Sequence, residues 1–555
     1  MSEKILVAVA WPYVNGPPHL GHIAGNTLPA DIFARFHRMI GNEVLMVSGS
    51  DQHGTPVALK AKEENVHPSK IAEKYHSIWN EMNNKMGFTF DLYTKTGTEN
   101  HKIVVQELFL KIKENGFLTE KESKQPYSDS LKMFMSDRYV LGTCKTCKNE
   151  ARGDQCETCN ITLDPKDLEN IRSAIDGSPL TFKKTTHMYL ELSKFQKKLK
   201  NWVENQNHWR LSVRNHTLGM IERGLIDRAI TRDIEWGIPV PLPKYENKRI
   251  YVWFEAVTGY LSASIEWSKS EKNNSCDQNA WKTWWENPKA KHYYFQGKDN
   301  VPFHTIIWPT MLMASGNKNL PYDVAANEYL NFGGKQFSKS KKWAVWLPDF
   351  LESYDPDPLR YHLTSIMPET SDSDFTWQSY LDANNNELVA TLGNFIHRVL
   401  SMTYNNFEGK VPNTKEQNPE SIAILKKCKK YMDKTKKFLE KREFRNGLKS
   451  VMSLAQEGNK YIDSKAPWKQ MKENKNDAAL TLNTALTIIS NLRIIMNPFL
   501  PFSSKKLAPF IGEDPDKKII WEFKEIKPNT PLKKPIPLFK KLDDDIVEKE
   551  EAKLI

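Results

Sequence analysis

Long hydrophobic runs are absent from this 555-residue sequence, although 39% of its residues are hydrophobic. No apolar run reaches the roughly 18 residues that a membrane-spanning helix needs, so no membrane partner is expected. The first apolar segment, residues 5–10, has neither a basic region before it nor a cleavage site after it. We therefore predict a core strand there and not a signal peptide.

Cysteine is also scarce, with six residues in the chain, which argues against a disulfide-stabilised scaffold and favours a reducing, cytoplasmic compartment. Cys276 and Cys428 stand alone and are predicted to be ordinary thiols. Four thiolates in two Cys-x-x-Cys pairs are typical of one tetrahedral, structural Zn²⁺ site. Redox-active cysteines are the alternative, but they leave two pairs in one short polar segment unexplained. The predicted zinc ligands are Cys144, Cys147, Cys156 and Cys159.

Acidic residues are fewer than basic ones: 68 Asp and Glu stand against 79 Lys and Arg, which gives a net charge of +11. An excess of this size favours a polyanionic partner such as a nucleic acid. The length predicts three or four domains with a large buried core.

Two histidines, His19 and His22, lie where a strand is predicted to turn into a helix. Residues 5–10 form a continuous apolar run, rich in β-branched residues, that is typical of a buried parallel strand, and residues 23–40 have apolar positions at helical spacing. A helix N-terminus binds phosphate through its free N–H groups, and Gly21 lets an adenine or ribose approach the backbone. The simpler interpretation is two surface histidines on a loop.

A lysine-rich loop later in the chain makes the phosphate interpretation stronger. Gly333 and Gly334 precede residues 335–342, which include Ser338 and Lys339. Glycines beside lysines predict a mobile loop that clamps the β- and γ-phosphates of ATP. The alternative, a solvated basic loop, leaves the glycines and serines without a role.

Residues 18–22 and 336–340 together resemble the His-Ile-Gly-His and Lys-Met-Ser-Lys-Ser signatures of the class I aminoacyl-tRNA synthetases. Gln336 departs from the first lysine of the second signature, although Lys335 is adjacent. The resemblance implies amino-acid activation by attack on the α-phosphate of ATP, with Mg²⁺ accompanying the nucleotide. The implied catalytic residues are His19, His22 and Lys339. The residues implied to bind ATP are His19, Gly21, His22, Gly297, Asp299, Ser338 and Lys339.

The predicted zinc ligands and two aromatic segments make the chain resemble one branch of this family in particular, the methionyl branch. This resemblance covers nearly the whole chain. The insertion at about residues 116–227 has room for a zinc knuckle but not for a long editing domain, and residues 171–174 lack the cysteines of a second knuckle. Residues 10–13 and 251–260 supply Trp and Tyr side chains, which suit a slot for a thioether. The residues implied to bind L-methionine are Ala10, Trp11, Tyr13, Asp51, Arg232, Trp253, Ala256, Tyr260, Asn300 and His304.

Two aspartates follow predicted strands, Asp51 after residues 44–47 and Asp299 after residues 292–295. Open α/β sheets bind ligands at the carboxyl ends of their strands. The resemblance makes Asp51 the partner of the substrate α-ammonium group and assigns Arg232 to the substrate carboxylate or a nearby phosphate. Asp299 is expected at the ribose hydroxyls. Each of these side chains is alternatively a simple turn residue.

Residues 376–510 are predicted to form an antiparallel helical bundle, because helical periodicity runs through them. Asn394 and Arg398 fall on one helix face, and Trp468 follows a rigid proline. Unpaired bases stack on aromatic rings and bond through their edges. The resemblance implies that these three residues meet the CAU anticodon of tRNA(Met). The alternative is a core Trp and a surface Arg.

The expected fold is α/β: a Rossmann-type parallel-sheet catalytic domain with a zinc-knuckle insertion, followed by an α-helical bundle that binds the anticodon. The chain ends at Ile555, too soon for the oligonucleotide-binding barrel that makes some relatives dimers, so a monomer is expected. The expected boundaries are 1–115 and 228–325 for the catalytic domain, 116–227 for the insertion, 326–375 for the lysine-loop and stem-contact region, 376–510 for the bundle and 511–555 for the C-terminal extension.

The implied activity is that of a ligase that activates L-methionine with ATP and transfers it to the 2′-hydroxyl of the terminal adenosine of tRNA(Met). One alternative is another class I synthetase, of which the cysteinyl type is the nearest. The closed set of four cysteines and the Trp/Tyr pocket argue against it. The other alternative is a non-catalytic tRNA-binding paralogue, against which the presence of His19, His22, Asp51 and Lys339 argues.

Overall fold

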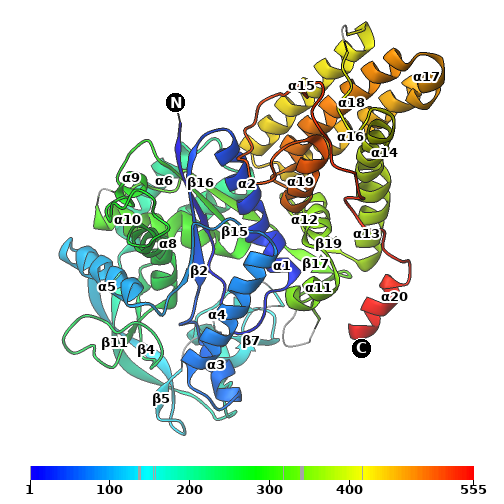
Figure 1. The fold of residues 1–555 in the computed structure, drawn as a ribbon. Coiled ribbons are helices and arrows are strands. Elements are labelled where there is room, and N and C mark those ends of the chain that lie inside the picture. The colour runs from blue at the N-terminus through cyan, green and yellow to red at the C-terminus, as the bar shows by residue number, and fades with distance from the viewer. Residues whose placement is uncertain are drawn as a thin grey trace.

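The chain folds into an α/β part and a helical bundle that lie side by side (Figure 1). The computed structural model describes residues 2–135, 139–153, 155–156, 158–159, 161–316, 318–337, 343–414 and 417–554.

A five-stranded sheet, with every neighbouring pair parallel, forms the centre of the α/β part, in the order β16-β15-β1-β2-β3. Its strands are β1 (Lys4–Val9), β2 (Glu43–Ser50), β3 (Leu92–Lys95), β15 (Lys291–Gly297) and β16 (Asp323–Asn327). Ile5, Val7 and Val9 enter one hydrophobic cluster, whereas Leu6 and Ala8 enter another. Both faces of the sheet are therefore buried, which explains the continuous apolar runs of its strands. The strands predicted from the sequence are confirmed.

Helices cover the two faces of this sheet. They are α1 (Leu20–His22), α2 (Leu28–Met39), α3 (Thr55–Glu63), α4 (Pro68–Lys85), α5 (Glu99–Glu114), α8 (Val252–Ser268), α9 (Lys282–Trp285) and α10 (Trp308–Ser315). Strand β1 lies between β2 and β15, so the direction of winding reverses there. Such a switch point leaves a crevice at the carboxyl ends of the strands, where ligands bind.

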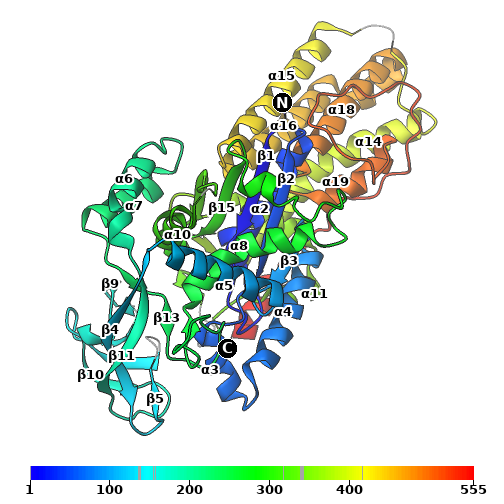
Figure 2. The same cartoon turned by 90° about the vertical axis from the view of Figure 1, so that its left-hand side faces the viewer.

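The insertion projects from the α/β part as a separate arm of strands and two helices (Figure 2). Long antiparallel strands β4 (Leu118–Ser128) and β11 (Thr181–Leu190) form its stem. Its outer part contains β6 (Val140–Cys144), β7 (Glu150–Arg152) and β10 (Leu168–Ser173) in one sheet. The remaining elements are β5 (Met133–Phe134), β8 (Gln155–Cys156), β9 (Ile161–Thr162), α6 (Gln196–Glu204), α7 (Leu211–Glu222), β12 (Arg228–Ala229), β13 (Thr231–Arg232) and β14 (Arg249–Ile250).

A small sheet and two helices connect the α/β part to the bundle. They are β17 (Leu330–Phe332), β18 (Lys335–Gln336), β19 (Ser373–Phe375), α11 (Leu347–Ser353) and α12 (Pro356–Ser365). The bundle helices are α13 (Trp377–Asp382), α14 (Asn394–Asn406), α15 (Pro419–Glu440), α16 (Phe444–Lys465), α17 (Pro467–Glu473), α18 (Lys475–Met496) and α19 (Pro501–Leu507). The predicted helical bundle is thus confirmed.

Helix α18 is long and apolar enough to span a membrane by length and composition alone. It is 89% buried inside the protein over the window that meets this test, as the core helix of a bundle is. It is the one such helix found among the described residues.

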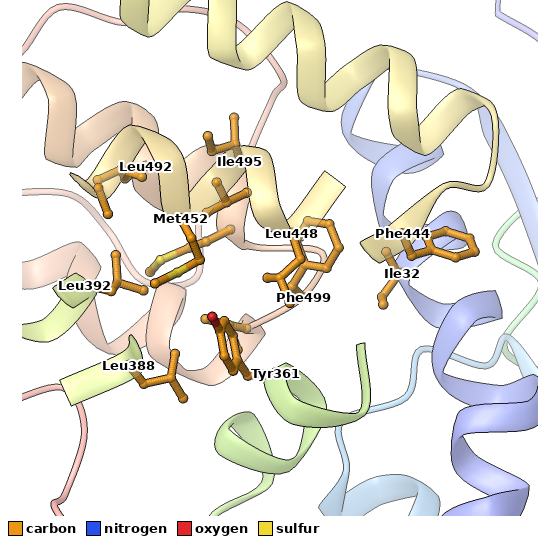
Figure 3. Close-up of a cluster of buried hydrophobic side chains, with 14 of the residues drawn as sticks. Ile32, Tyr361, Leu388, Leu392, Phe444, Leu448, Met452, Leu492, Ile495 and Phe499 are labelled. Atoms are coloured by element: carbon orange, nitrogen blue, oxygen red, sulfur yellow. The ribbon is translucent and has the colours of Figure 1, made fainter. Parts of the chain in front are cut away.

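One hydrophobic core continues from the α/β part into the bundle. Figure 3 shows Ile32 of α2 near Phe444 of α16, and Tyr361 of α12 below the bundle residues. The buried Arg360 guanidinium reinforces this junction, because it lies 2.7 Å from the Asp31 carboxylate and donates to the carbonyl of Phe499. The charges of Arg35 and Arg360 overcome the effect of burial and lower the pKa of Asp31 to about 2.

The C-terminal extension returns along the bundle toward α11 and ends with α20 (Ile546–Glu551) (Figure 1). Asn385 exchanges two hydrogen bonds with the backbone of Leu542, at 2.9 Å each. The Tyr354 hydroxyl donates to the Glu550 carboxylate at 2.7 Å. These contacts fix the extension to the segment that follows the lysine-rich loop.

Candidate active site

His19 and His22 lie side by side at the carboxyl end of β1. His19 has extended backbone geometry and is the N-cap of α1. Its N–H donates to Nδ1 of His22 at 3.1 Å, and the two imidazole rings are 3.6 Å apart. A π-helical turn, Ile23–Thr27, follows immediately and leads into α2. Such turns occur often at functional sites, and this one sets the helix N-terminus beside the two rings.

The second signature packs directly on the first. The ring of Phe337 is stacked on His19, with centroids 4.8 Å apart and planes 4° apart. A Cβ atom on Gly21 would lie 3.1 Å from both rings, a tight contact, so the glycine makes room for this close approach. Beyond the loop, the Leu20 N–H donates to the carbonyl of Val345 at 3.2 Å. Ser338 and Lys339 lie outside the described residues, but the described segments on both sides of them contact the first signature.

The residues expected at the ribose follow the neighbouring strand β15. A Cβ atom on Gly297 would meet no other atom within 4 Å, so the backbone there faces open space. Asp299 is exposed, and its carboxylate accepts a hydrogen bond from the Tyr329 hydroxyl. Because β15 pairs with β1, this carboxylate lies at the same edge of the sheet as the histidines.

Aromatic rings line the space beside the histidines. Cβ atoms on Gly49 and Gly259 would approach the Trp11 ring to 2.5 Å and 2.8 Å, so both glycines make room for the indole. The rings of Tyr13 and Trp253 meet edge to face, with centroids 5.9 Å apart. Ala10 and Ala256 are buried, and the Ala10 N–H ties β1 to β15. The structure thus brings these predicted pocket residues together.

Tyr260, Asn300 and His304 form one hydrogen-bonded unit in this pocket. Nδ1 of His304 lies 2.9 Å from the Asn300 carbonyl, which can only accept, so Nδ1 carries the proton. Nε2 then accepts from the Tyr260 hydroxyl at 2.7 Å. Burial lowers the pKa of His304 to about 4, so this imidazole is neutral at pH 7. The unit presents an uncharged, polarisable wall.

Asp51 is almost fully buried at the carboxyl end of β2. Its backbone bridges to Tyr13, and Oδ1 accepts from the His53 N–H at 3.1 Å. Burial, together with the Glu255 charge, raises the pKa of Asp51 to about 8. A buried carboxylate of this kind is costly without a cation, so the site favours a positively charged ligand group.

Three residues of the site, His53, His101 and Glu255, were missed from the sequence. Glu255 is fully buried; its Oε1 bonds to Nδ1 of His53 and lies 3.7 Å from Nε2 of His101. Burial alone would raise the pKa of Glu255, but the charge of His53 and the contact with His101 hold it at about 2. The His101 ring also stacks on Trp11. The charged Glu255 among the apolar residues that begin helix α8 is the signal that points to this cluster.

Arg232 packs against the residue that precedes α8, the helix that carries Trp253, Ala256 and Tyr260. Its guanidinium lies 3.9 Å from the ring centre of Tyr251, the residue just before α8, and donates to the carbonyls of Ala229 and Thr231. These contacts connect Arg232 to the start of α8, the helix that carries Trp253. None of the described contacts of Arg232 is with Asp51.

The four predicted metal ligands come together in the insertion. All four Sγ atoms lie within 4.8 Å of one another, and the Cys144–Cys159 and Cys147–Cys156 pairs are 3.9 Å and 3.4 Å apart. Tetrahedral thiolates around Zn²⁺ are about 3.8 Å apart, so the cluster fits one metal ion. A hydrogen bond from the Cys159 backbone N–H lowers the pKa of Cys156 to about 6, whereas burial and the neighbouring thiols raise the pKa of Cys159 to about 12.

The residues expected at the anticodon meet at one end of the bundle. Asn394 is exposed in the first turn of α14, and Arg398 follows one turn later. The Arg398 guanidinium lies 5.4 Å from the Trp468 ring centre and 2.9 Å from the Asp463 carboxylate. Trp468 is 41% exposed and follows Pro467 at the start of α17. The indole therefore remains available for stacking.

Comparisons with known proteins agree with this architecture. Residues 5–400 match the family model described as "tRNA synthetases class I (M)", and residues 411–554 match the "Anticodon binding domain of methionyl tRNA ligase". The chain is 48% identical to a methionine–tRNA ligase of Dehalococcoides mccartyi (strain CBDB1), over 100% of both chains. It is 43% identical to that of Thermomicrobium roseum, over 100% of this chain and 99% of the relative.

The fold also matches a solved structure, Mycobacterium tuberculosis methionyl-tRNA synthetase in complex with methionyl-adenylate. The TM-score is 0.80 at 23% identity, and the match covers 97% of this chain and 100% of that one. Together with the paired signatures and the two family models, these similarities show that the chain belongs to the methionyl branch of the class I aminoacyl-tRNA synthetases.

Proposed function

We propose that this protein is a methionine–tRNA ligase, which forms methionyl-adenylate from L-methionine and ATP and transfers methionine to tRNA(Met). The observation that carries the proposal is the stacking of Phe337 on His19 beside a buried aromatic pocket. It joins the two nucleotide signatures beside a site that contains two buried acids, Asp51 and Glu255. Full-length relatives at 48% identity carry the same name.

In the first step the methionine carboxylate attacks the α-phosphorus of ATP, the bond to the β-phosphate oxygen breaks, and pyrophosphate leaves. Most of the rate enhancement of such a reaction comes from positioning the reactants and stabilising the charge that develops on the phosphates. His19 and His22 are assigned to donate to phosphate oxygens, and Lys339 and Ser338 to hold the departing pyrophosphate. Gly297 and Asp299 are assigned to the ribose. Mg²⁺ bound with ATP supplies further neutralisation of the phosphate charge.

Methionine recognition is assigned to the pocket beside these groups. Asp51 takes the α-ammonium group, and Arg232 takes the carboxylate or a phosphate. The neutral Tyr260–His304 pair and the indoles of Trp11 and Trp253 surround the thioether, for which aromatic contacts are favourable. The other assigned pocket residues are Ala10, Tyr13, Ala256 and Asn300.

In the second step the 2′-hydroxyl of the terminal adenosine of the tRNA attacks the carbonyl carbon of the adenylate, and AMP leaves. Asn394, Arg398 and Trp468 are assigned to the anticodon, because an exposed indole and a guanidinium together suit unpaired bases. The four cysteines are assigned one structural Zn²⁺, since a closed set of four ligands leaves no open position for catalysis.

The division of the chain into the five parts expected from the sequence is part of this proposal. So is its action as a monomer in the cytoplasm, where its tRNA substrate is charged. Light scattering at working concentration tests the oligomeric state directly, and a dimer mass would contradict it.

Aminoacylation with labelled methionine and tRNA(Met) tests the proposal. The wild-type protein is expected to charge this tRNA. Trp468→Ala is expected to raise KM for tRNA about 10- to 100-fold, since stacking on one base contributes about 1–3 kcal/mol. Ile422→Ala, which removes another exposed apolar side chain of the bundle, is the matched control. Equal KM values for the two variants would overturn the anticodon assignment, and no charging would overturn the ligase.

A further inference from the structure

A basic cavity of about 430 Å³ lies between the α/β part, the bundle and the C-terminal extension. Its charged lining residues are Arg35, Arg38, Arg493, Lys505, Lys517 and Lys518. No carboxylate is among the lining residues that the structure describes. The volume is in the usual range for small-molecule sites.

The cavity is separate from the candidate active site. Arg35 and Arg38 lie in the last turns of α2, and β2 begins soon afterwards at Glu43. The cavity is therefore at the amino end of the sheet, whereas His19 and Asp299 follow the carboxyl ends of their strands. A ligand here would not occupy the ATP site.

Four of the six basic residues that line the cavity form ion pairs with acids. Arg38 pairs with Asp91 at 2.7 Å, and Lys505 pairs with Asp516 at 2.7 Å. Arg35 forms an ion pair with Asp31, and Arg493 forms one with Glu513. Lys517 and Lys518 have no ion pair with any described residue and are exposed at the rim. Two cations are thus left for a ligand.

Hydrogen-bond donors on α18 also lack good acceptors. Arg493 is only 4% exposed; its Nε donates to the Ser504 carbonyl at 3.0 Å and its Nη1 to Glu513. Its Nη2 is buried and has no partner among the described residues. One turn later, the Asn497 amide donates to the thioether of Met39 at 3.3 Å, and sulfur is a weak acceptor. Buried donors without acceptors point to a missing oxygen-rich group.

An aromatic face adjoins these donors. Phe502 lines the cavity and is 42% exposed. Its ring packs against Gly87, where φ is +70° and a Cβ atom would lie 2.7 Å from the ring. The ring is therefore held in place from behind, with part of its surface open for stacking.

We propose that the basic cavity is a second nucleotide-binding site, which takes phosphate groups on Arg493, Lys517 and Lys518 and a base on the ring of Phe502. Surplus cations and unpartnered donors suit phosphate oxygens, and the exposed aromatic ring suits a base, whichever base it is. The bound nucleotide contacts α2, α18, α19 and the C-terminal extension simultaneously. It therefore stabilises the junction between the α/β part and the bundle.

Equilibrium dialysis with GDP tests this proposal, with the catalytic site filled by one equivalent of a non-hydrolysable methionyl-adenylate analogue. One GDP is expected to bind per chain. The double variant Lys517→Glu/Lys518→Glu is expected to weaken GDP binding at least about tenfold, since charge-assisted hydrogen bonds are lost. Phe502→Ala is expected to weaken it as well. Lys533→Glu/Lys534→Glu, an exposed pair in the same extension, is the matched control and is expected to bind GDP normally.

Three results would overturn the proposal. GDP binding that this one equivalent of the analogue displaces belongs to the catalytic site. Equal losses in the two double variants indicate a general charge effect. In the third result, the wild-type protein binds no GDP and the Lys517→Glu/Lys518→Glu variant binds tRNA more weakly. This result would show that the surface contacts RNA and is not a nucleotide site. Methionine activation is measured in parallel, so that failure of this site is distinguished from failure of the proposed function.

Discussion

Phe337 lies face to face with His19, with ring centroids 4.8 Å apart and planes 4° apart. The two residues come from signatures at opposite ends of the catalytic region, and each signature follows a different strand. Their contact places Phe337, the last described residue before Ser338, over the turn that carries both histidines. The second signature thus contacts the first through an apolar side chain, Phe337.

Phe337→Ala is expected to lower kcat/KM for ATP by up to about 100-fold, because a misplacement of about 1 Å in the positioning groups costs that much. KM for methionine is expected to stay unchanged. Phe337→Met keeps an apolar side chain on the His19 ring and is the matched control, with near wild-type activity. ATP–pyrophosphate exchange at varied ATP gives both values. Equal activity of the Ala and Met variants would show that the contact has no catalytic role.

Glu255→Gln is expected to raise KM for methionine about tenfold or more and to leave KM for ATP unchanged. The change removes the charge that holds His53, whose backbone N–H bonds to Asp51. Breaking a buried ion pair also costs about 3–5 kcal/mol of stability, so a lower Tm is expected. Glu266→Gln, at a half-buried position later in α8, is the control. Parallel increases in both KM values would mean general damage to the site.

Methionine affinity is expected to improve as the pH rises from 6 toward 8. Burial and the Glu255 charge raise the pKa of Asp51 to about 8, and only its carboxylate form binds an ammonium group well. Calorimetric titration of methionine at several pH values measures this dependence. A Kd that stays constant between pH 6 and pH 8 would contradict the role of Asp51.

The same raised pKa has the opposite effect on stability. The folded state favours the protonated form of Asp51. The stability that this preference contributes is fully present below the pKa of Asp51 in the unfolded chain, which is about 4. It is lost as the pH rises through the pKa of Asp51 in the folded protein, which is about 8. Asp51→Asn is therefore expected to have a higher Tm than the wild-type protein at pH 8, although it binds methionine poorly. A lower Tm at pH 8 would show that Asp51 is stabilised as a carboxylate in the folded state.

Removal of zinc is expected to unfold the outer part of the insertion and to leave the central sheet intact. The cysteines sit in a small cluster whose core includes Val140, Ala151 and Leu168, so the metal supplies much of its stability. Hydrogen exchange after chelation should rise in β6, β7 and β10 but not in β1 or β2. Cys156→Ser should release one Zn²⁺ per chain, whereas Cys276→Ser should release none. Unchanged exchange in β6 after metal loss would contradict a structural role.

The elements and signatures were predictable because each has a strong local pattern. The apolar strand at residues 5–10, the turn at His19 and the paired cysteines need no tertiary information to be found. The bundle helices likewise follow from periodicity, and the structure has them at the expected place.

The contacts that complete the site were not predictable in the same way. Glu255 looks like an isolated charge in the apolar first turns of α8, and only the fold brings it to His53 and His101 from two other elements. The π-helical turn after His22 depends on packing and has no sequence signal that we recognised. Long-range pairs of this kind are set by tertiary contacts, which local propensity does not encode.

Amino-acid-dependent ATP–pyrophosphate exchange, run with each of the twenty amino acids and without tRNA, tests the central claim most directly. The account predicts exchange with methionine alone, because the site combines Asp51, assigned to the ammonium group, with a neutral aromatic slot for the thioether. Exchange with another amino acid would contradict the pocket assignment. No exchange with any of the twenty, from protein that still binds tRNA(Met), would contradict the ligase itself.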